Sequence, residues 1–308
     1  MKRLFCRYHL LIALISVFSH CAAWGADNGQ TAAGFLTIGV DARSTALAGA
    51  LTSASDDATA SFWNPAGLAN VNSIQLICSH QSWYQDISFE YAAAAMPLNE
   101  EITISVSFAF LSYGEITGYD ISDNPTGDIN STYDFAGGIS LGYRILDKLT
   151  IGLTAKHIIV SLAGIKASAN AFDFGLRLNS QIGSIGITAA NIGTDLIFRE
   201  KQNKLPALIR AGFSIKPSGQ SLILVSEVDF PFYNRVKYKN GIELSFSDHY
   251  FLRAGYGISQ DNNAENMAGG YSLGGGLRLG SSHLDYSFSP GISITSEYLH
   301  QFTVRFQL

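Results

Sequence analysis

The feature that most constrains the fold is an alternation of side-chain types with a period of two residues, which dominates the chain from Ser73 to Leu308. In residues 102–110, isoleucine, valine and phenylalanine alternate with threonine, serine and alanine. Residues 134–145 and 172–179 repeat the pattern with glycine, serine or a charged residue between the apolar ones. A period of two places alternate side chains on opposite faces of a sheet. These segments are therefore predicted to be strands with one apolar face and one small or charged face.

About fourteen segments follow this pattern. An even number is what a single-chain bacterial β-barrel requires. The predicted strands cover residues 73–80, 87–97, 100–112, 132–146, 148–162, 168–179, 182–193, 205–216, 220–230, 237–247, 249–259, 268–279, 281–290 and 297–308.

The connections between these segments alternate in length, and this separates a membrane barrel from a soluble β-sandwich. Short turns at one end, long loops at the other and both termini on the short-turn side are typical of outer-membrane barrels. Only 15% of the residues are charged, against about 25% in soluble domains, and no apolar run approaches the ~18 residues of a spanning helix. We therefore expect an all-β fold, a 14-stranded antiparallel transmembrane β-barrel over residues 73–308. The short links lie at Pro97–Glu100, Asp147, Ser180–Gly183, Pro217–Gln220, Asp248 and Ser281, and the longer ones include 113–131, 194–204 and 260–267.

Residues 1–25 have the order of a secretory signal peptide: basic residues, then the apolar run Leu10–Phe18, then small residues up to Gly25. Three of the 20 basic residues and none of the 25 acidic residues lie in this segment, so the remaining chain carries 17 basic against 25 acidic side chains. This balance argues against a nucleic-acid partner. The predicted location is the bacterial outer membrane, with membrane lipid around the barrel and both termini in the periplasm.

The charged residues of the predicted strands share the phase of the small residues, so we expect them to face the lumen. Seven cations against six anions predict paired networks, because unpaired charges in a narrow interior are costly. The cations are Arg144, Lys156, Arg177, Arg210, Arg253, Arg278 and Arg305, and the anions are Asp134, Asp173, Glu227, Asp229, Glu243 and Asp285.

Residues 26–72, here called the plug segment, interrupt the strand pattern from residue 34 to residue 70. Asp41 can cap a short alanine-rich helix, and Ser55 with the two aspartates that follow it can start a second. Asn64 followed by Pro65 has the form of an N-cap and a first helical position. A compact segment rich in alanine and glycine ahead of a barrel is consistent with a short helical hatch, or plug, inside the lumen.

No catalytic, metal or cofactor motif emerges, and we expect no enzymatic activity. Ser140 and Ser272 lie in G-x-S-x-G sequences, but both are within alternating strands and lack the strand-to-helix elbow that exposes a nucleophile. The histidines are scattered without metal-ligand spacing. The glycines at 274–276 lack dinucleotide-binding spacing, and the acidic loops lack the EF-hand pattern.

The plug segment also carries a family resemblance. Gly34–Arg43, Ala48–Ala50, Asp56–Ala58 and Trp63–Ala69 together resemble the N-terminal motif of the PorV/PorQ family, which belongs to the FadL-like outer-membrane barrels. Weaker similarity continues in fragments along nearly the whole chain after residue 25. The resemblance implies a fourteen-stranded barrel whose hatch motif lies in the lumen. That motif consists of Trp63, Asn64, Pro65, Ala66, Gly67 and Leu68.

The resemblance implies more than one function. The leading hypothesis is a type IX secretion accessory whose long loops bind exported cargo proteins or a surface-attachment protease. The alternative is a FadL-like transporter of long-chain fatty acids or other hydrophobic compounds, which needs an apolar pocket and a movable hatch. A third hypothesis is a structural or antigenic surface protein. Balanced luminal charge argues against a wide, ion-selective pore.

Overall fold

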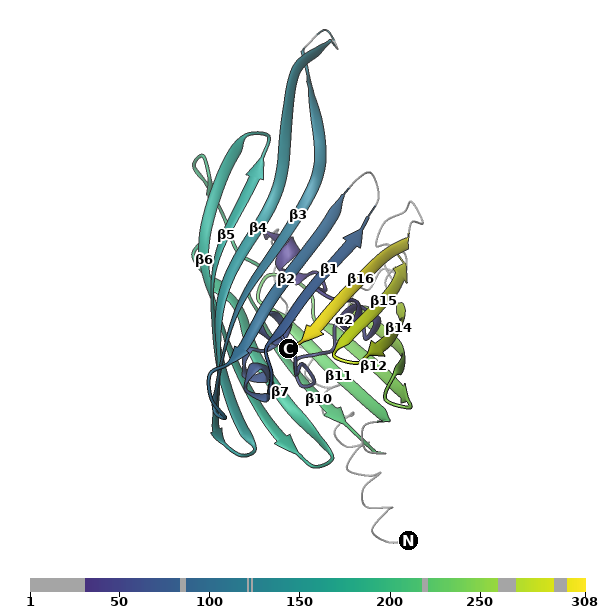
Figure 1. Cartoon of the computed structure of the whole chain (residues 1–308). Helices are drawn as coiled ribbons and strands as arrows, with labels where there is room; N and C mark the ends of the chain where they lie inside the picture. Colours follow the sequence, from purple (N-terminus) through teal and green to yellow (C-terminus); the bar gives the residue numbers. More distant parts are fainter. Residues whose placement is uncertain are drawn as a thin grey trace.

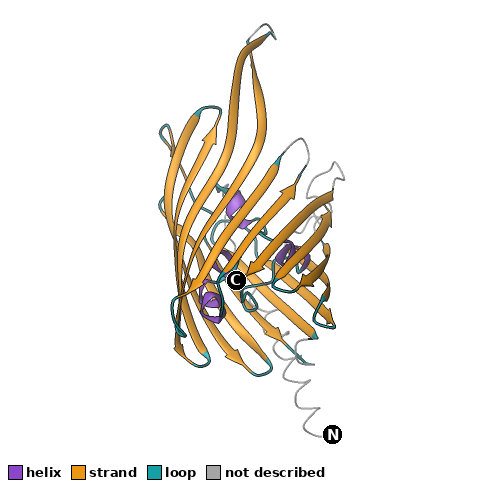
Figure 2. Ribbon diagram, viewed as in Figure 1, coloured by secondary structure: helices purple, strands orange, loops and turns teal. Residues whose placement is uncertain are grey.

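The computed structural model describes residues 31–83, 87–120, 122, 124–217, 221–259, 270–290 and 298–308. The predicted signal peptide and the polar loop 260–267 lie outside these residues. Fourteen antiparallel strands form one closed barrel (Figures 1 and 2), which confirms the predicted fold class. In order around the wall, the strands are β1 (Gln75–Ser82), β16 (Tyr298–Gln307), β15 (Ser282–Pro290), β14 (Tyr271–Leu279), β13 (Tyr250–Ser259), β12 (Lys237–Phe246), β11 (Leu222–Pro231), β10 (Leu208–Ile215), β7 (Gly183–Gly193), β6 (Ile165–Ser180), β5 (Leu149–Leu162), β4 (Pro125–Leu146), β3 (Ile102–Tyr119) and β2 (Ser88–Pro97).

The strand faces follow the alternation in the sequence. Along β6, Phe172, Phe174, Leu176 and Leu178 are 43–55% exposed on the outer surface, whereas the charged residues between them are buried. Most other strands repeat this arrangement, which is the reverse of a soluble sheet. On β2 the inner face is apolar, because Phe89, Tyr91 and Ala93 are buried against the plug segment. An apolar outside around a polar inside suits a wall surrounded by lipid.

The two ends of the barrel differ. At one end, called the turn end, Gly280 and Ser281 alone connect β14 to β15, and the amide of Leu308 donates to the carbonyl of Ile74 at 2.9 Å. The C-terminus and the exit of the plug segment therefore lie at the turn end. The opposite end, called the loop end, carries the longer connections. The division of short and long connections between the two ends is not complete, because only Ala163 and Gly164 join β5 to β6 at the loop end.

Two predicted loops contain strands. Residues 113–131 were predicted as a long loop, but β3 runs to Tyr119 and β4 starts at Pro125, so the two strands form a hairpin that rises above the rest of the barrel (Figure 1). Residues 194–204 contain the short hairpin of β8 (Leu196–Phe198) and β9 (Lys201–Asn203). The β8–β9 hairpin packs on the core through Leu196, which is fully buried, but each of its strands has only three residues, too few to show a period of two.

The plug segment forms four short helical elements. They are η1 (Gly34–Thr37), α2 (Ala42–Ala46), α3 (Ala60–Trp63) and η2 (Pro65–Asn70). The Asp41 side chain caps α2 by accepting from the Ser44 amide at 3.0 Å, as predicted. The second helix starts at Ala60 and not near Ser55, because the Asp57 carboxylate accepts from the Thr59 amide at 2.9 Å and holds a turn there.

The hydrophobic core of the molecule lies inside the barrel, between the plug segment and the wall. Most residues from 40 to 71 are buried, and Trp63, Leu47, Leu51 and Leu68 are at most 1% exposed. Among the described residues, no helix is both long and apolar enough to cross a membrane. The buried side chains of the plug segment therefore form the hydrophobic core together with the inner face of the wall.

Candidate functional site: the plug and the luminal cavity

A row of wall glycines receives the hatch motif. Gly142, Gly152 and Gly175 are direct neighbours across β4, β5 and β6. A Cβ atom at Gly152 would overlap the carbonyl carbon of Pro65, and one at Gly175 would overlap the Asn64 side chain. The plug backbone therefore lies directly against the wall backbone, and only glycine leaves room for this contact.

Asn64 fixes the turn that occupies this row. Its side-chain oxygen accepts from the Ala66 amide at 3.1 Å, which caps η2. Its side-chain amide donates to the carbonyl of Thr52 at 2.8 Å and to the carbonyl of Leu176 in the wall at 3.2 Å. The structure thus places the hatch motif in the lumen, where all six of its residues are buried: Trp63, Asn64, Pro65, Ala66, Gly67 and Leu68.

A second pair of glycines receives the other part of the plug segment. Gly241 of β12 and Gly255 of β13 are neighbours in the sheet. A Cβ at Gly241 would lie 2.9 Å from a methyl carbon of Leu47, and one at Gly255 would overlap the Ala48 amide nitrogen. The plug segment is thus seated on opposite stretches of the wall.

Ion pairs join the plug segment to the wall between these seats. The Arg43 guanidinium binds Glu243 of β12 at 3.0 Å and Asp56 of the plug segment at 3.0 Å. Arg253 of β13 binds the same Glu243 at 2.6 Å and Asp285 of β15 at 2.6 Å. The result is a buried chain of alternating charges that runs from the plug across three strands.

The strands at the closure of the barrel also contact the plug segment. Arg305 of β16 pairs with Asp57, and the Ala42 amide donates to the Thr303 hydroxyl of β16 at 2.8 Å. On β1, the side chain of Gln75 accepts from the Ala58 amide at 3.1 Å. The plug segment therefore binds both strands of the β1–β16 seam.

A further cluster surrounds the Trp63 ring. The Arg210 guanidinium lies 5.0 Å and the Lys239 ammonium 5.7 Å from the ring centroid. Lys239 also pairs with Asp229 at 2.6 Å and Glu227 at 3.3 Å, and Glu227 accepts from an amide of the plug segment. Cations at these distances are attracted to an aromatic face, so the cluster holds the tryptophan in place.

The other predicted luminal charges have separate surroundings. Lys156 binds Asp173 at 2.8 Å within the wall. Arg177 donates to the carbonyl of Ser55, and Arg144 donates to the carbonyl of Ala69 at 2.6 Å. Arg278 is exposed at the turn end and donates to the carbonyl of Gly280, so it makes no such contact with the plug.

The pKa values of the plug carboxyls diverge. Burial and the nearby charge of Asp57 raise the pKa of Asp41 above its ordinary value. Burial acts in the same direction on Asp56, but the cationic charges of Arg43 and Arg177 outweigh it and lower the pKa of Asp56. Asp56 is therefore held as a carboxylate beside Arg43.

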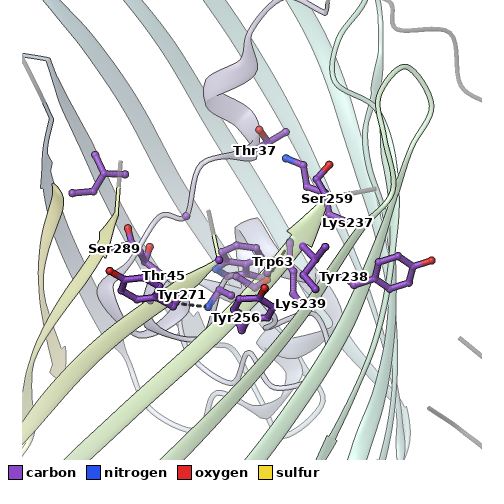
Figure 3. Close-up of a pocket in the computed structure, with 18 of the residues that line it drawn as sticks. Thr37, Thr45, Trp63, Lys237, Tyr238, Lys239, Tyr256, Ser259, Tyr271 and Ser289 are labelled. Carbon is purple, nitrogen blue, oxygen red and sulfur yellow. Dashed lines mark hydrogen bonds between the residues drawn. The ribbon is translucent and has the colours of Figure 1, made fainter. Parts of the chain in front are cut away.

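A cavity of about 460 Å³ lies between the plug segment and the loop-end portions of β12, β13 and β14. Figure 3 shows Lys237 and Lys239 projecting from β12 on one side of the strand, and Tyr238 projecting on the other. Tyr256 and Tyr271 are about half exposed on the outer surface, so the side chains that face the cavity are a mixture of polar groups and of apolar ones such as Trp63 and Leu299. The lining residues are Thr37, Gly39, Thr45, Ala48, Gly49, Trp63, Asn234, Lys237, Tyr238, Lys239, Tyr256, Gly257, Ile258, Ser259, Gly270, Tyr271, Ser272, Ser289 and Leu299.

Sequence reasoning missed Lys237 and Lys239, although they share the phase of Glu243 in the same strand. It also missed Arg43, Asp56 and Asp57, because the plug segment has no period that reveals which side chains meet the wall. Among the described residues, no group of three or more His, Cys, Asp or Glu side chains is placed to hold a metal ion.

A closed barrel of fourteen antiparallel strands, filled by its own N-terminal segment, defines the class of protein: a plugged β-barrel. No protein-family model and no curated protein sequence matches the chain. Several solved structures share its fold. The toluene transporter TodX of Pseudomonas putida matches with a TM-score of 0.63 and 12% identity, over 87% of this chain and 96% of that one.

Two further structures agree. The toluene transporter TbuX of Ralstonia pickettii has a TM-score of 0.60 and 14% identity, over 88% of this chain and 98% of that one. A FadL homologue of Pseudomonas aeruginosa has a TM-score of 0.55 and 10% identity, over 87% of this chain and 98% of that one. At these identities the similarity establishes the fold.

Proposed function

We propose that this protein is an integral outer-membrane barrel that admits hydrophobic small molecules, with the turn end and both termini in the periplasm. The observation that carries the proposal is the plugged barrel with a luminal cavity, in a fold similar to that of proteins described as toluene transporters. A plug that fills the lumen suits selective passage better than free diffusion through a pore.

The contacts of the plug segment support passage controlled by that segment. Its ion pairs with Glu243 and Arg305 join it to the wall by side chains. The hatch motif at Asn64–Ala66 is instead held by close backbone contact and by the uncharged side-chain amide of Asn64, which donates to the carbonyl of Leu176 in the wall. We infer that the residues before the hatch motif rearrange during passage and that the hatch motif stays seated.

The G-x-S-x-G serines support a role without catalysis. The Ser140 hydroxyl is 2.9 Å from the Thr154 hydroxyl, and the Ser272 hydroxyl donates to the carbonyl of Ala46 in the plug segment. No hydrogen bond joins either serine to a histidine in the described part of the chain. Both hydroxyls serve packing between strands or between wall and plug.

A secretion role remains the second candidate. The observation that favours it is the β3–β4 hairpin, which rises above the barrel and offers a site for a protein partner (Figure 2). This candidate otherwise rests on the resemblance of the plug motif to the PorV/PorQ family.

Mild purification from outer membranes, followed by mass spectrometry of all bound material, tests the two candidates. Apolar small molecules without stoichiometric protein partners are the expected result. Co-purifying secreted proteins or an attachment protease, in the absence of such molecules, would replace the transport proposal with the secretion role.

A further inference from the structure

The cavity has a mixed lining. Trp63 and Leu299 contribute apolar side chains to it, and Thr37, Ser259 and Lys237 contribute polar ones. Sites for small molecules are usually lined by apolar and aromatic side chains with a few polar groups. The ammonium group of Lys237 distinguishes this cavity from a site for a plain hydrocarbon.

The charges around the cavity do not cancel. At its floor, Lys239 and Arg210 stand beside Glu227 and Asp229, so two cations balance two anions. Lys237 is one further cation on the same face of β12. Asp229 lies opposite Lys237 in the sheet register, but its carboxylate binds Lys239 at 2.6 Å.

Lys237 therefore lacks an acidic partner within 4.0 Å among the described residues, whereas the luminal lysines Lys156 and Lys239 each have one. Its side chain is exposed where it borders the cavity. A cation in a partly enclosed polar cavity attracts an anion, and a hydrogen bond between opposite charges is about twice as strong as a neutral one.

We propose that Lys237 binds the acidic group of a compact aromatic acid in this cavity. The inference rests on the proposed transport function and names the class of molecule that is transported. The volume of about 460 Å³ lies in the range of small-molecule sites. The carboxylate lies at the ammonium group of Lys237, and the ring lies against the backbone of Gly49 and Gly257 and the edge of Trp63. The described lining offers no apolar sleeve for an extended acyl chain.

Calorimetric titration of the full-length protein in detergent tests this assignment with three ligands of similar size: benzoate, benzamide and toluene. Benzamide keeps the shape of benzoate without its charge. Benzoate is expected to bind about tenfold or more tightly than benzamide, which is the fold-change of one charge-assisted hydrogen bond. Lys237→Gln should remove that difference, and Lys237→Arg should restore most of it.

The matched control is Lys201→Gln, because Lys201 is exposed on β9 and does not line the cavity. Lys201→Gln should leave the affinity for benzoate unchanged. The comparison of benzoate with benzamide uses the unaltered protein, so it does not depend on whether a variant folds. Equal binding of benzoate and benzamide, or an unchanged preference in Lys237→Gln, would overturn the inference. If toluene binds and benzoate is not preferred, the transport proposal stands and only the inference about Lys237 fails. If none of the three ligands binds, both the transport proposal and the inference fail.

Discussion

Glu243 is the residue on which the charged contacts between plug and wall converge. It accepts from Arg43 of the plug segment and from Arg253 of the neighbouring strand, and it is 5% exposed. Its charge is therefore balanced from two sides in a place that water barely reaches. A buried pair adds little net stability over apolar packing, but removal of one partner leaves a charge uncompensated.

Replacement of Glu243 by glutamine should lower the free energy of unfolding by about 3–5 kcal/mol, because two buried guanidinium groups lose their shared carboxylate. Urea unfolding in lipid vesicles measures the change. The matched control is Asp195→Asn, which removes the pair of Asp195 with the exposed Lys204 and should cost about 1 kcal/mol or less. Equal losses in the two variants would show that the buried chain of charges has no special role.

The carboxyl group of Asp56 makes the stability of the folded protein depend on pH. Its pKa is lowered in the folded protein, so the folded state favours the carboxylate more than the unfolded state does. The stabilisation is present above the unfolded value, near 3.8, and is lost as the pH falls through the lowered folded value. Because the side chain is 40% exposed, the effect should be about 1 kcal/mol or less.

The stability difference between the unaltered protein and Asp56→Asn should therefore be present at neutral pH and fade below the ordinary aspartate pKa. Chemical unfolding at a series of pH values measures it. A difference that stays constant down to the most acidic value would mean that Asp56 acts through packing and not through its charge.

Residue-level prediction from the sequence had a definite limit. Strand phase placed Glu243, Arg253 and Asp285 on one face, and all three are buried inside the barrel. The partners of these charges were expected within the wall, yet Arg43 is separated from Glu243 by 200 residues in the chain. A short irregular segment gives no periodicity from which such a contact can be inferred.

At the scale of elements, η2 makes a close backbone contact with the row of glycines in β4, β5 and β6. Gly152→Ala should unseat the hatch motif, because a Cβ would overlap the Pro65 backbone. We expect a loss of about 1–3 kcal/mol from overpacking and raised conductance in planar bilayers.

The control for this change is Gly275→Ala on the outer face of β14. A Cβ there would lie 3.6 Å from the nearest atom, the carbonyl oxygen of Phe251, which is an ordinary contact. This variant should keep both the stability and the conductance of the unaltered protein. If both variants raise the conductance, the increase comes from a change in the strands and not from displacement of the plug segment.

The β3–β4 hairpin should be dispensable for folding. It leaves the wall at Gly114, where the backbone has a positive φ of 75° and the strand register shifts. Deletion of residues 115–131 with a short turn in their place should leave the barrel intact, as judged by heat-modifiable migration on gels. Failure to fold would show that the hairpin contributes to barrel assembly.

Elements of the wall were predictable, and those outside it were not. Each of the fourteen strands overlaps a segment with period two, because each has lipid on one side and the plug or lumen on the other. The strands of the β8–β9 hairpin have three residues each, too few to show the period, and the upper parts of β3 and β4 lie in a polar stretch of the sequence that predicts a loop. In the plug segment, the caps at Asp41 and Asn64 were visible in the sequence, but the start of α3 at Ala60 was not.

At the scale of the whole molecule, the apolar outer surface predicts how the protein behaves in solution. It should require detergent, show a β-rich circular dichroism spectrum and migrate differently on gels before and after heating. The apolar band of the wall causes all three. A monodisperse monomer that stays soluble without detergent would contradict the assignment to a membrane.

The contacts of the plug segment with both β1 and β16 reinforce the seam of the barrel. These two strands are the first and the last of the wall, and they pair with each other along their length. Residues 42 and 57 bind β16 from inside, and residue 58 binds β1. The plug segment therefore acts as a non-covalent crosslink between the two strands that close the barrel.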